Sequence, residues 1–407
     1  MTGKLKPYPR YKDSGVEWLG DVPEHWVLDR IKSHFQIEKR ISGSLDYDVL
    51  SITQKGIVVK DIDSGEGQLS MDYSKYQLIF KGEFGMNHMD LLTGYIDISK
   101  YNGVVSPDYR VFSIKNQIFN TNFYLYVFQT FYINKIFYKY GQGSSQLGRW
   151  RLPSEEFYGF RIPTPSPDEQ ITISNYLDKQ TAKIDQLIEN YQKLIVLSKK
   201  KIIALALNEQ IAGNGAYEKL SHLVRLIERP VDVKNNTEYE ALGLYNRGRG
   251  LFHKPKTLGK DLGESDFFYV KCGDLILSGQ FSWEGAVAMA NQSENNCIVS
   301  HRYPIIKGKK IMTEYLYALL MTEYGDFLLN ESSRGAAGRN RPLNINLLLN
   351  EKIRVPSQLV QEEIYDLLIV KTNLERNIIK ATDLLKEKRT ALITAAVTGK
   401  VDVREYA

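Results

Sequence analysis

The chain has 407 residues, of which 43% are hydrophobic and 25% charged, and its net charge is +5. These proportions are typical of a soluble globular protein and exclude a disordered, collagenous or membrane chain. Only Cys272 and Cys297 are present, which excludes a disulfide framework and a cysteine-rich zinc module. Without a leader-like N-terminus or a long apolar run, we expect a cytoplasmic location.

The charge surplus is unevenly distributed along the chain. Residues 1–167 carry +2 and residues 213–357 carry +3, whereas residues 168–212 and 358–407 are neutral. The chain is too long for one ordinary core. We therefore expect two large domains, each followed by a segment of different character.

Weak identities recur along the chain at a nearly constant shift. Tyr47–Leu50 matches Tyr239–Leu242 at a shift of 192, and Arg161–Pro163 matches Arg354–Pro356 at a shift of 193. The order of the features between these matches repeats as well. The sequence therefore predicts a tandem of two units of about 190 residues.

The first part of each unit is predicted to be mixed α/β. Short β-branched and aromatic runs between Gly and Asn turns occur at residues 46–60, 77–82 and 266–278. An aromatic-rich helical stretch follows, at residues 117–140 in the first unit and 313–330 in the second. We expect its aromatic side chains to pack in a core rather than to stack on bases.

A long helix introduced by proline closes each unit. No glycine or proline interrupts residues 168–212, and Asp168 and Glu169 suit an N-terminal helical turn. Apolar residues at 4-3 spacing predict that the two helices pair as a coiled coil and act as spacers. We expect the second helix to be about six residues shorter. The predicted seam of the first helix contains Ile173, Leu177, Gln180, Ile184, Leu187, Tyr191, Leu194, Ser198 and Leu205.

Motifs of catalysis are missing from the sequence. It contains no phosphate-binding loop, dinucleotide fingerprint, H-E-x-x-H, G-x-S-x-G or amino-methyltransferase tetrapeptide. The six histidines are dispersed and lack metal-ligand spacing. We therefore predict that the chain is not an enzyme, with no catalytic residue, no metal site and no bound cofactor.

Polar, basic loops recur in both units and are the candidate nucleic-acid contacts. Such loops are usually only solvated, but their recurrence favours binding, because Arg, Gln, Asn and Ser read base edges or hold phosphates. The sequence leaves open which arginines would pair with guanine and which would grip phosphate. The candidate DNA-binding residues are Gln54, Lys55, Ser144, Ser145, Gln146, Arg149, Arg151, Asn246, Arg247, Arg249, Arg334, Arg339, Asn340 and Arg341.

Three segments resemble signatures of a known family. Residues 8–26, 162–170 and 384–404 are similar to the N-terminal signature, the proline–Glu-Gln joint and the C-terminal signature of the specificity (S, HsdS) subunit of type I restriction–modification systems. With the tandem organisation, the resemblance covers essentially the whole chain. It implies an α+β fold in which two mixed α/β target recognition domains are separated by two antiparallel spacer helices.

The resemblance assigns the domains as 1–167 and 213–357 for target recognition, 168–212 for the first spacer, and 358–407 for the second spacer and tail. It implies a non-catalytic reader of double-stranded DNA that assembles with two adenine methyltransferase subunits and two motor–nuclease subunits. S-adenosylmethionine, ATP and Mg²⁺ would belong to those partners. The candidate joint and docking residues are Pro163, Glu169, Gln170, Pro356, Glu362 and Glu363, with Glu363 aligned to Gln170.

Two unlike readers held by a rigid pair of helices predict a bipartite, asymmetric target, with half-sites about one helical turn, roughly 34 Å, apart. Two other functions stay open at this point. The chain could be a tandem coiled-coil adaptor whose mixed domains bind protein. It could also methylate or cut DNA itself, which the missing motifs oppose.

Overall fold

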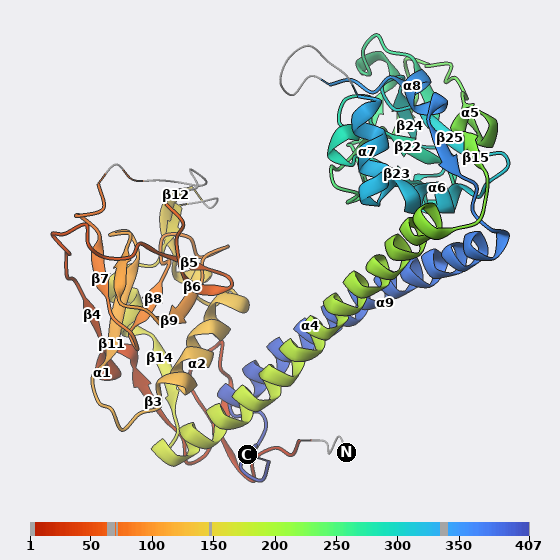
Figure 1. Cartoon of the computed structure of the whole chain (residues 1–407). Helices are drawn as coiled ribbons and strands as arrows, with labels where there is room; N and C mark the ends of the chain where they lie inside the picture. Colours follow the sequence, from red (N-terminus) through yellow and green to blue (C-terminus); the bar gives the residue numbers. More distant parts are fainter. Residues whose placement is uncertain (1–4, 63–69, 71, 146–148, 334–340, 407) are drawn as a thin grey trace. The chain divides into compact units, whose positions relative to one another are not determined.

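The computed structural model describes residues 5–62, 70, 72–145, 149–333 and 341–406 (Figure 1). The chain divides into two compact units, both of which contain part of each long helix. Unit 1 comprises Met1–Ile188 and Ala381–Ala407, and unit 2 comprises Glu189–Lys380. Among the described residues, no helix is long and apolar enough to cross a membrane.

Unit 1 consists of short strands and few helices before the first long helix. Its strands are β1 (Tyr11–Asp13), β2 (Asp21–Pro23), β3 (Val27–Arg30), β4 (Phe35–Glu38), β5 (Leu50–Thr53), β6 (Gly56–Val59), β7 (Gln77–Ile79), β8 (Phe84–Met86), β9 (Ile96–Ile98), β10 (Gly103–Val105), β11 (Arg110–Ile114), β12 (Gln142–Ser145), β13 (Arg149–Arg151) and β14 (Arg161–Thr164). Its helices are α1 (Ile31–His34), α2 (Thr121–Ile133), the 3-10 turn η1 (Phe137–Tyr140), α3 (Ser154–Gly159) and the start of α4 (Pro167–Ala212).

Unit 2 repeats this order of elements. Its strands are β15 (Tyr217–Lys219), β16 (Val224–Ile227), β17 (Glu238–Tyr239), β18 (Leu242–Leu244), β19 (Leu251–His253), β20 (Thr257–Leu258), β21 (Phe267–Tyr269), β22 (Leu275–Leu277), β23 (Val287–Met289), β24 (Ile298–Ser300), β25 (Ile305–Gly308) and β26 (Lys352–Arg354). Its helices are α5 (Leu220–Leu223), η2 (Gly259–Asp261), η3 (Ser282–Glu284), η4 (Gln292–Glu294), α6 (Thr313–Leu320), α7 (Glu323–Glu331), α8 (Ile345–Asn350) and the start of α9 (Gln358–Val397).

The two units share one sheet topology. The four-stranded antiparallel sheet has the order β4-β11-β8-β9 in unit 1 and β16-β25-β22-β23 in unit 2. The hairpin β5–β6 corresponds to β18–β19, the pair β7–β10 to β21–β24, and the pair β3–β14 to β15–β26. The predicted tandem repeat and α+β class are confirmed by this correspondence.

The core of unit 1 is aromatic. Phe123, Tyr124, Phe128 and Phe131 of α2 are fully buried, and Phe128 contacts Phe35, Phe84 and Phe112 of the sheet at ring-centroid distances of 5.1–5.6 Å. The prediction that this run packs in a core is confirmed. The helix is shorter than the expected 117–140, because Asn120 caps its start and Asn134 ends it.

The core of unit 2 is mainly aliphatic. Leu275, Leu277, Leu316 and Leu319 lie in its main buried cluster, with Tyr315 as the one aromatic ring among the fully buried members described. The helix expected over 313–330 is broken after Leu320. Thr322 caps the new helix α7, because its hydroxyl accepts the Gly325 N–H at 3.0 Å.

The long helices α4 and α9 pack together in both units. In unit 1, Ile173 near the start of α4 and Ala396 near the end of α9 belong to one buried cluster. In unit 2, Ile202 near the end of α4 clusters with Ile364 near the start of α9. The helices are therefore antiparallel, as predicted. Their lengths of 46 and 40 residues also agree with the predicted difference.

The predicted seam of α4 is only partly correct. Ile173, Leu177 and Ile184 are buried, but Leu187 and Leu194 are 38% and 45% exposed. A strict seven-residue repeat drifts around a helix of 3.6 residues per turn. The less exposed positions instead follow an eleven-residue step, as in Ile173, Ile184, Ile195 and Ala206. The exposed leucines are left on the outer surface of the helix.

Candidate nucleic-acid interface and helix joints

Two candidate loops of unit 1 meet at the connection between β8 and β9. Gln54 and Lys55 form the exposed turn of the β5–β6 hairpin, and the Gln54 side-chain amide donates to the Thr93 carbonyl at 3.4 Å. The backbone N–H of Leu91, in the same connection, donates to the Trp150 carbonyl in the β12–β13 hairpin at 3.2 Å. The β8–β9 connection therefore links both candidate loops.

The β12–β13 hairpin carries Ser144, Ser145, Arg149 and Arg151. Ser145 pairs with Arg149, and Gln142 pairs with Arg151 across a register irregularity. Arg151 is exposed at the base of the hairpin. Gln146 lies outside the described residues, as do the side chains of Ser144, Ser145 and Arg149.

The hairpin of unit 2 has a longer loop with more bonds to its surroundings. The N–H groups of Arg247 and Gly248 donate to the carbonyls of Glu284 and Gly285, both at 2.8 Å. Arg247 and Gly248 both adopt φ of +58°, a left-handed pair that turns the chain sharply. The loop holds Asn246 against the Glu284 carboxylate and leaves the Arg247 side chain exposed.

Two of the candidate DNA-binding arginines of unit 2 lie over aromatic rings. The Arg249 guanidinium is 5.0 Å from the centroid of the Tyr245 ring, and the Arg341 guanidinium is 5.4 Å from that of Trp283. Such stacking orients the planar donor group without neutralising its charge. Arg334, Arg339 and Asn340 lie outside the described residues.

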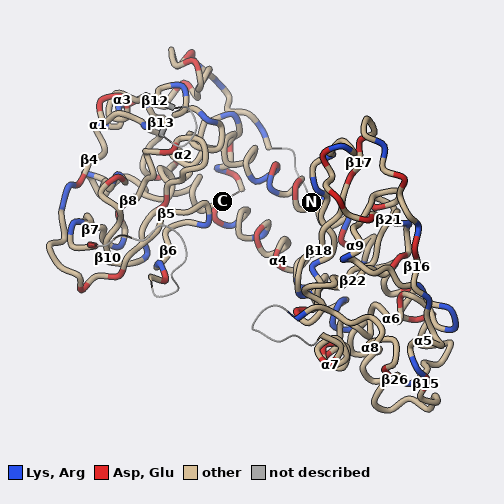
Figure 2. Tube along the Cα trace, turned by 90° about the horizontal axis from the view of Figure 1, so that it is seen from above, with Lys and Arg blue, Asp and Glu red and all other residues tan. Residues whose placement is uncertain are grey.

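The candidate residues occupy equivalent places in the two units. Trp283 and Glu284 belong to the β22–β23 connection, which corresponds to the β8–β9 connection. In unit 1 the connection contacts the β5–β6 turn and the β12–β13 hairpin. In unit 2 it contacts the β18–β19 loop and Arg341. We call these assemblies loop cluster 1 and loop cluster 2. Figure 2 shows that Lys and Arg are interspersed with Asp and Glu along both units, so neither unit carries charge of one sign only.

The start of α4 is joined to both chain ends within unit 1. Glu169 is 6% exposed; its carboxylate accepts the Tyr8 hydroxyl at 2.8 Å and lies 2.9 Å from His25 Nε2. The Arg404 guanidinium lies over the Tyr8 ring at 4.9 Å and pairs with Asp402 at 2.6 Å. The three segments that carry the family resemblance therefore converge here. Burial and the Glu169 carboxylate raise the pKa of Tyr8 well above its usual range.

A buried glutamine ties each long helix to its unit in the same way. The Gln170 side chain donates to the Pro165 carbonyl at 2.9 Å and accepts the Asn120 N–H at 2.9 Å. The Gln361 side chain donates to the Pro356 carbonyl at 3.2 Å and accepts the Met312 N–H at 2.7 Å. These matched bonds make Gln361 the counterpart of Gln170.

The expected alignment of Glu363 with Gln170 is therefore wrong by two residues. The correct shift is 191, which pairs Pro165 with Pro356 and leaves Pro163 as a buried residue of β14. The shift of 193 was favoured by four identities, which pair Arg161 with Arg354, Pro163 with Pro356, Glu169 with Glu362 and Ile171 with Ile364. Glu362 and Glu363 are exposed on α9, and Glu363 lies 3.5 Å from Lys201 of α4.

His88 belongs to the β8–β9 connection of loop cluster 1, and its surroundings keep its side chain neutral. Its backbone carbonyl accepts the Leu152 N–H at 2.9 Å, next to the β12–β13 hairpin. Burial, together with the positive charges of Arg110 and Arg151, lowers the pKa of His88 to about 3. Arg110 is itself buried, and its guanidinium donates to the Leu152 carbonyl at 2.8 Å.

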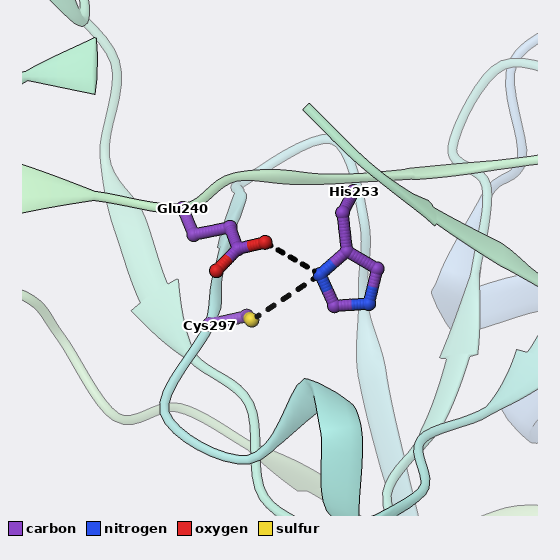
Figure 3. Close-up of side chains that lie close together, drawn as sticks. All are labelled: Glu240, His253 and Cys297. Atoms are coloured by element: carbon purple, nitrogen blue, oxygen red, sulfur yellow. Dashed lines mark hydrogen bonds and ion pairs between the residues drawn. The ribbon is translucent and has the colours of Figure 1, made fainter. Parts of the chain in front are cut away.

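One group in unit 2 could hold a metal ion. Glu240, His253 and Cys297 place a carboxylate oxygen, a ring nitrogen and a sulfur within 4.8 Å of one another (Figure 3). Spacings of 13 and 44 residues resemble no metal motif, so this group could not be predicted from sequence patterns. The dispersed histidine spacing, which predicted no metal site, did not indicate that His253 lies beside two other potential ligands.

No protein-family model and no curated protein matches the chain. Several solved structures, in contrast, are similar to the chain over most of its length. A chain of the structure described as "Structural basis underlying complex assembly and conformational transition of the type I R-M system" matches with a TM-score of 0.54 at 13% identity, covering 93% of this chain and 99% of that one. The chain shares the fold of that type I restriction–modification protein.

Two further type I-like structures match over most of their length. The HsdS subunit from Thermoanaerobacter tengcongensis gives a TM-score of 0.48 at 14% identity, covering 93% of this chain and 98% of that one. The type I restriction–modification S subunit from M. genitalium gives 0.44 at 14% identity, covering 98% and 99%.

Proposed function

We propose that this chain is the sequence-specific DNA-recognition subunit of a type I restriction–modification complex. The observation that carries the proposal is the pair of loop clusters, which occupy equivalent places on one repeated scaffold with the type I fold. Because the repeated scaffold presents exposed basic side chains at equivalent positions in both units, it can contact one DNA duplex at two places.

The two loop clusters differ in sequence and backbone, which supports an asymmetric target. Cluster 1 offers a tight turn with Gln54 and Lys55, whereas cluster 2 offers a longer loop with Arg247 and Arg249. Different donors at equivalent places read different base edges. The target is therefore bipartite, with two unlike half-sites and an unread gap.

Stacked and unstacked arginines have different roles in this proposal. Arg249 and Arg341 are oriented by aromatic rings and suit a bidentate contact with guanine. Arg247 and Lys55 are exposed without such support and suit phosphate. Gln146, Arg334, Arg339 and Asn340 complete the candidate set from outside the described residues.

The assembly and its chemistry belong to partner subunits. Exposed apolar residues on the long helices offer contact surface for two methyltransferase and two motor–nuclease subunits. The chain itself is not catalytic; S-adenosylmethionine, ATP and Mg²⁺ bind to those partners, and the methyltransferases flip the target adenines out of the duplex. The complex acts in the cytoplasm. The exposed apolar residues include Leu187, Leu194, Val196 and Leu197 on α4 and Ile369, Val370, Ile379 and Leu384 on α9.

Selection from a random duplex pool tests the proposal, with the methyltransferase partner present. We expect enrichment of one bipartite sequence. Arg341→Ala or Arg249→Ala should relax one position at a loss of about 1–3 kcal/mol, whereas Lys55→Ala should weaken all sequences alike. Arg225, exposed on the edge strand β16 and not part of the loops that form the clusters, provides the control Arg225→Ala.

A pool without an enriched sequence would contradict DNA recognition and favour a protein-binding adaptor. Enrichment that survives Arg249→Ala and Arg341→Ala unchanged would contradict the assignment of loop cluster 2. Methyl transfer by the isolated chain, measured with labelled donor, would contradict its non-catalytic role.

A further inference from the structure

Three side chains with different metal-binding atoms converge in unit 2 (Figure 3). Glu240 Oε1 lies 2.8 Å from His253 Nδ1, and Cys297 Sγ lies 4.0 Å from the same nitrogen. The Cys297 residue is 5% exposed, whereas the His253 and Glu240 side chains are about one-third exposed. The group is therefore anchored on its sulfur side and reachable from solvent on the other.

Backbone hydrogen bonds fix the three residues side by side. The Ile298 N–H, next to Cys297, donates to the Glu240 carbonyl at 3.0 Å. His253 is the last residue of β19 and pairs with Leu242 of β18, two residues after Glu240. The donors therefore come from three adjacent extended segments, not from a mobile loop.

A fourth residue orients the histidine. The Glu294 carboxylate lies 3.2 Å from His253 Nε2, and it is held by the Ser293 hydroxyl and the Asn291 N–H, both at 2.6 Å. A carboxylate that accepts one imidazole N–H leaves the other nitrogen free to bind a metal, the usual outer partner of a metal-bound histidine. Once the Nδ1 proton has been displaced by a metal ion, Glu294 keeps the Nε2 proton in place, so the Nδ1 lone pair faces Glu240 and Cys297.

We propose that Glu240, His253 and Cys297 bind one Zn²⁺ ion in unit 2, with water at the fourth position. Thiolate, imidazole and carboxylate are zinc ligands, and two anionic ligands balance the charge of the ion. Tetrahedral zinc places its donor atoms about 3.3–3.8 Å apart. The Glu240–His253 distance must widen and the Cys297–His253 distance must shorten by a few tenths of an ångström.

Binding of the zinc ion requires that Cys297 and His253 lose the protons on their metal-binding atoms. Burial raises the pKa of the Cys297 thiol, and the carboxylates of Glu240 and Glu294 raise it further. Zinc binding displaces the thiol proton and the proton shared by His253 Nδ1 and Glu240, so it releases protons to solvent. The bound ion ties together β19, the β17–β18 connection and the start of β24.

The equivalent place in unit 1 lacks this donor set. There the Val104 N–H donates to the Asp48 carbonyl, and Val59 pairs with Leu50, as Ile298, Glu240, His253 and Leu242 do in unit 2. The counterparts of Glu240, His253 and Cys297 are therefore Asp48, Val59 and Gly103. The site is a property of unit 2 and not of the repeated scaffold, and it does not depend on the proposed function.

Cobalt and zinc binding to the full chain tests the site. The exposed Cys272 is first removed as Cys272→Ser, which leaves Cys297 as the one thiol. Titration of the metal-free protein with Co²⁺ should give a thiolate-to-cobalt band and tetrahedral visible absorption at one equivalent, and Zn²⁺ should displace both. Addition of Zn²⁺ in weak buffer should release protons.

Matched variants separate the site from adventitious binding. Cys297→Ser should abolish the thiolate band. Glu240→Gln, whose side chain is partly exposed and whose folding is checked by circular dichroism, should weaken Zn²⁺ binding at least about tenfold, and Glu294→Gln about 10–100-fold. His301→Gln is the control on another exposed histidine and should change nothing.

Two outcomes would overturn the proposal. One is the absence of a thiolate band in the folded Cys272→Ser protein. The other is Zn²⁺ affinity unchanged by Glu240→Gln, which would show that the ion binds elsewhere on the chain.

Discussion

The two units have the same sheet order and the same helix joint, but they are built from different side chains. Unit 1 fills its core with the aromatic rings around Phe128, whereas unit 2 uses aliphatic residues around Leu319. Their loop clusters and the Glu240 group differ as well. The comparison teaches that backbone topology and a few buried hydrogen bonds suffice to preserve the scaffold while the exposed loops diverge.

The joint is the part of the scaffold that both units preserve most closely. Gln170 and Gln361 make the same two hydrogen bonds, and the Pro-Ser pair that precedes each long helix, Pro165–Ser166 and Pro356–Ser357, is identical as well. Unit 1 adds the buried Glu169, which is bound by Tyr8 and His25; its counterpart in unit 2 is Val360. Residues near both ends of the chain therefore pack around the start of α4 in unit 1. The start of α9 belongs to unit 2, which contains neither end of the chain.

The first prediction tests whether the two cores are independent. Phe128→Ala should destabilise unit 1 by about 3–5 kcal/mol, because it removes a ring packed against three others. Trp18, Trp26 and Trp150 lie in unit 1, so denaturant unfolding followed by tryptophan fluorescence in a Trp283→Phe background reports that unit. Leu319→Ala, which alters the core of unit 2, should leave the denaturant midpoint of unit 1 unchanged in the same background. Equal shifts from both variants would show that the units unfold as one.

The second prediction concerns acid. Because the pKa of His88 is about 3 in the folded chain, the unfolded chain binds the extra proton as pH falls below about 6.5. The stability of unit 1 should therefore fall with pH, by about 2 kcal/mol between pH 6.5 and 5. Urea unfolding of His88→Gln should show a shallower pH dependence. If the free energy of unfolding of His88→Gln depends on pH as steeply as that of the unchanged protein, His88 is not the cause of the acid sensitivity.

His253 of unit 2 should respond in the opposite direction. Burial lowers its pKa, but hydrogen bonds to Glu240 and Glu294 outweigh burial and raise it. In the absence of metal, its contribution to stability is present in acid and is lost as pH rises through the folded pKa. The same titrations, followed through Trp283, measure this difference between the units.

The third prediction tests the equivalence of the joints. Gln170→Leu and Gln361→Leu should each lower the free energy of unfolding by about 1–3 kcal/mol, because each leaves a buried carbonyl and a partly buried N–H without a partner. Glu363→Gln is the control, and it should change stability by at most about 1 kcal/mol, since its pair with Lys201 is exposed. Thermal unfolding measures all three. A large loss of stability in Glu363→Gln, with no loss in Gln361→Leu, would contradict the alignment at a shift of 191 and support the alignment at 193.

Repetitive features of this fold were predictable from the sequence, whereas features that depend on single contacts were not. The tandem order, the paired helices and the aromatic core follow from composition and periodicity. The break at Thr322 depends on one side-chain cap, and the exposure of Leu187 depends on where the seam drifts. The joint was misaligned because sequence identities support both shifts, 191 and 193, and only the matched hydrogen bonds of Gln170 and Gln361 show which one is correct.

The loop clusters show the same division. Basic residues in loops were visible in the sequence, but the contacts of Thr93 and Leu91 that join two loops of unit 1 were not. The equivalent role of Trp283 and Glu284 in unit 2 gave no sequence signal either. Non-local proximity also explains why the Glu240, His253 and Cys297 group escaped prediction.

The central claim is that this chain sets the DNA sequence at which a partner methylates adenine. Methylated adenines are best mapped across the host genome with and without the gene for this chain. We predict one bipartite, asymmetric motif that is methylated only when the gene is present, and loss of one half-site specificity when the arginines of loop cluster 2 are replaced. An identical methylation map without the gene would contradict the account.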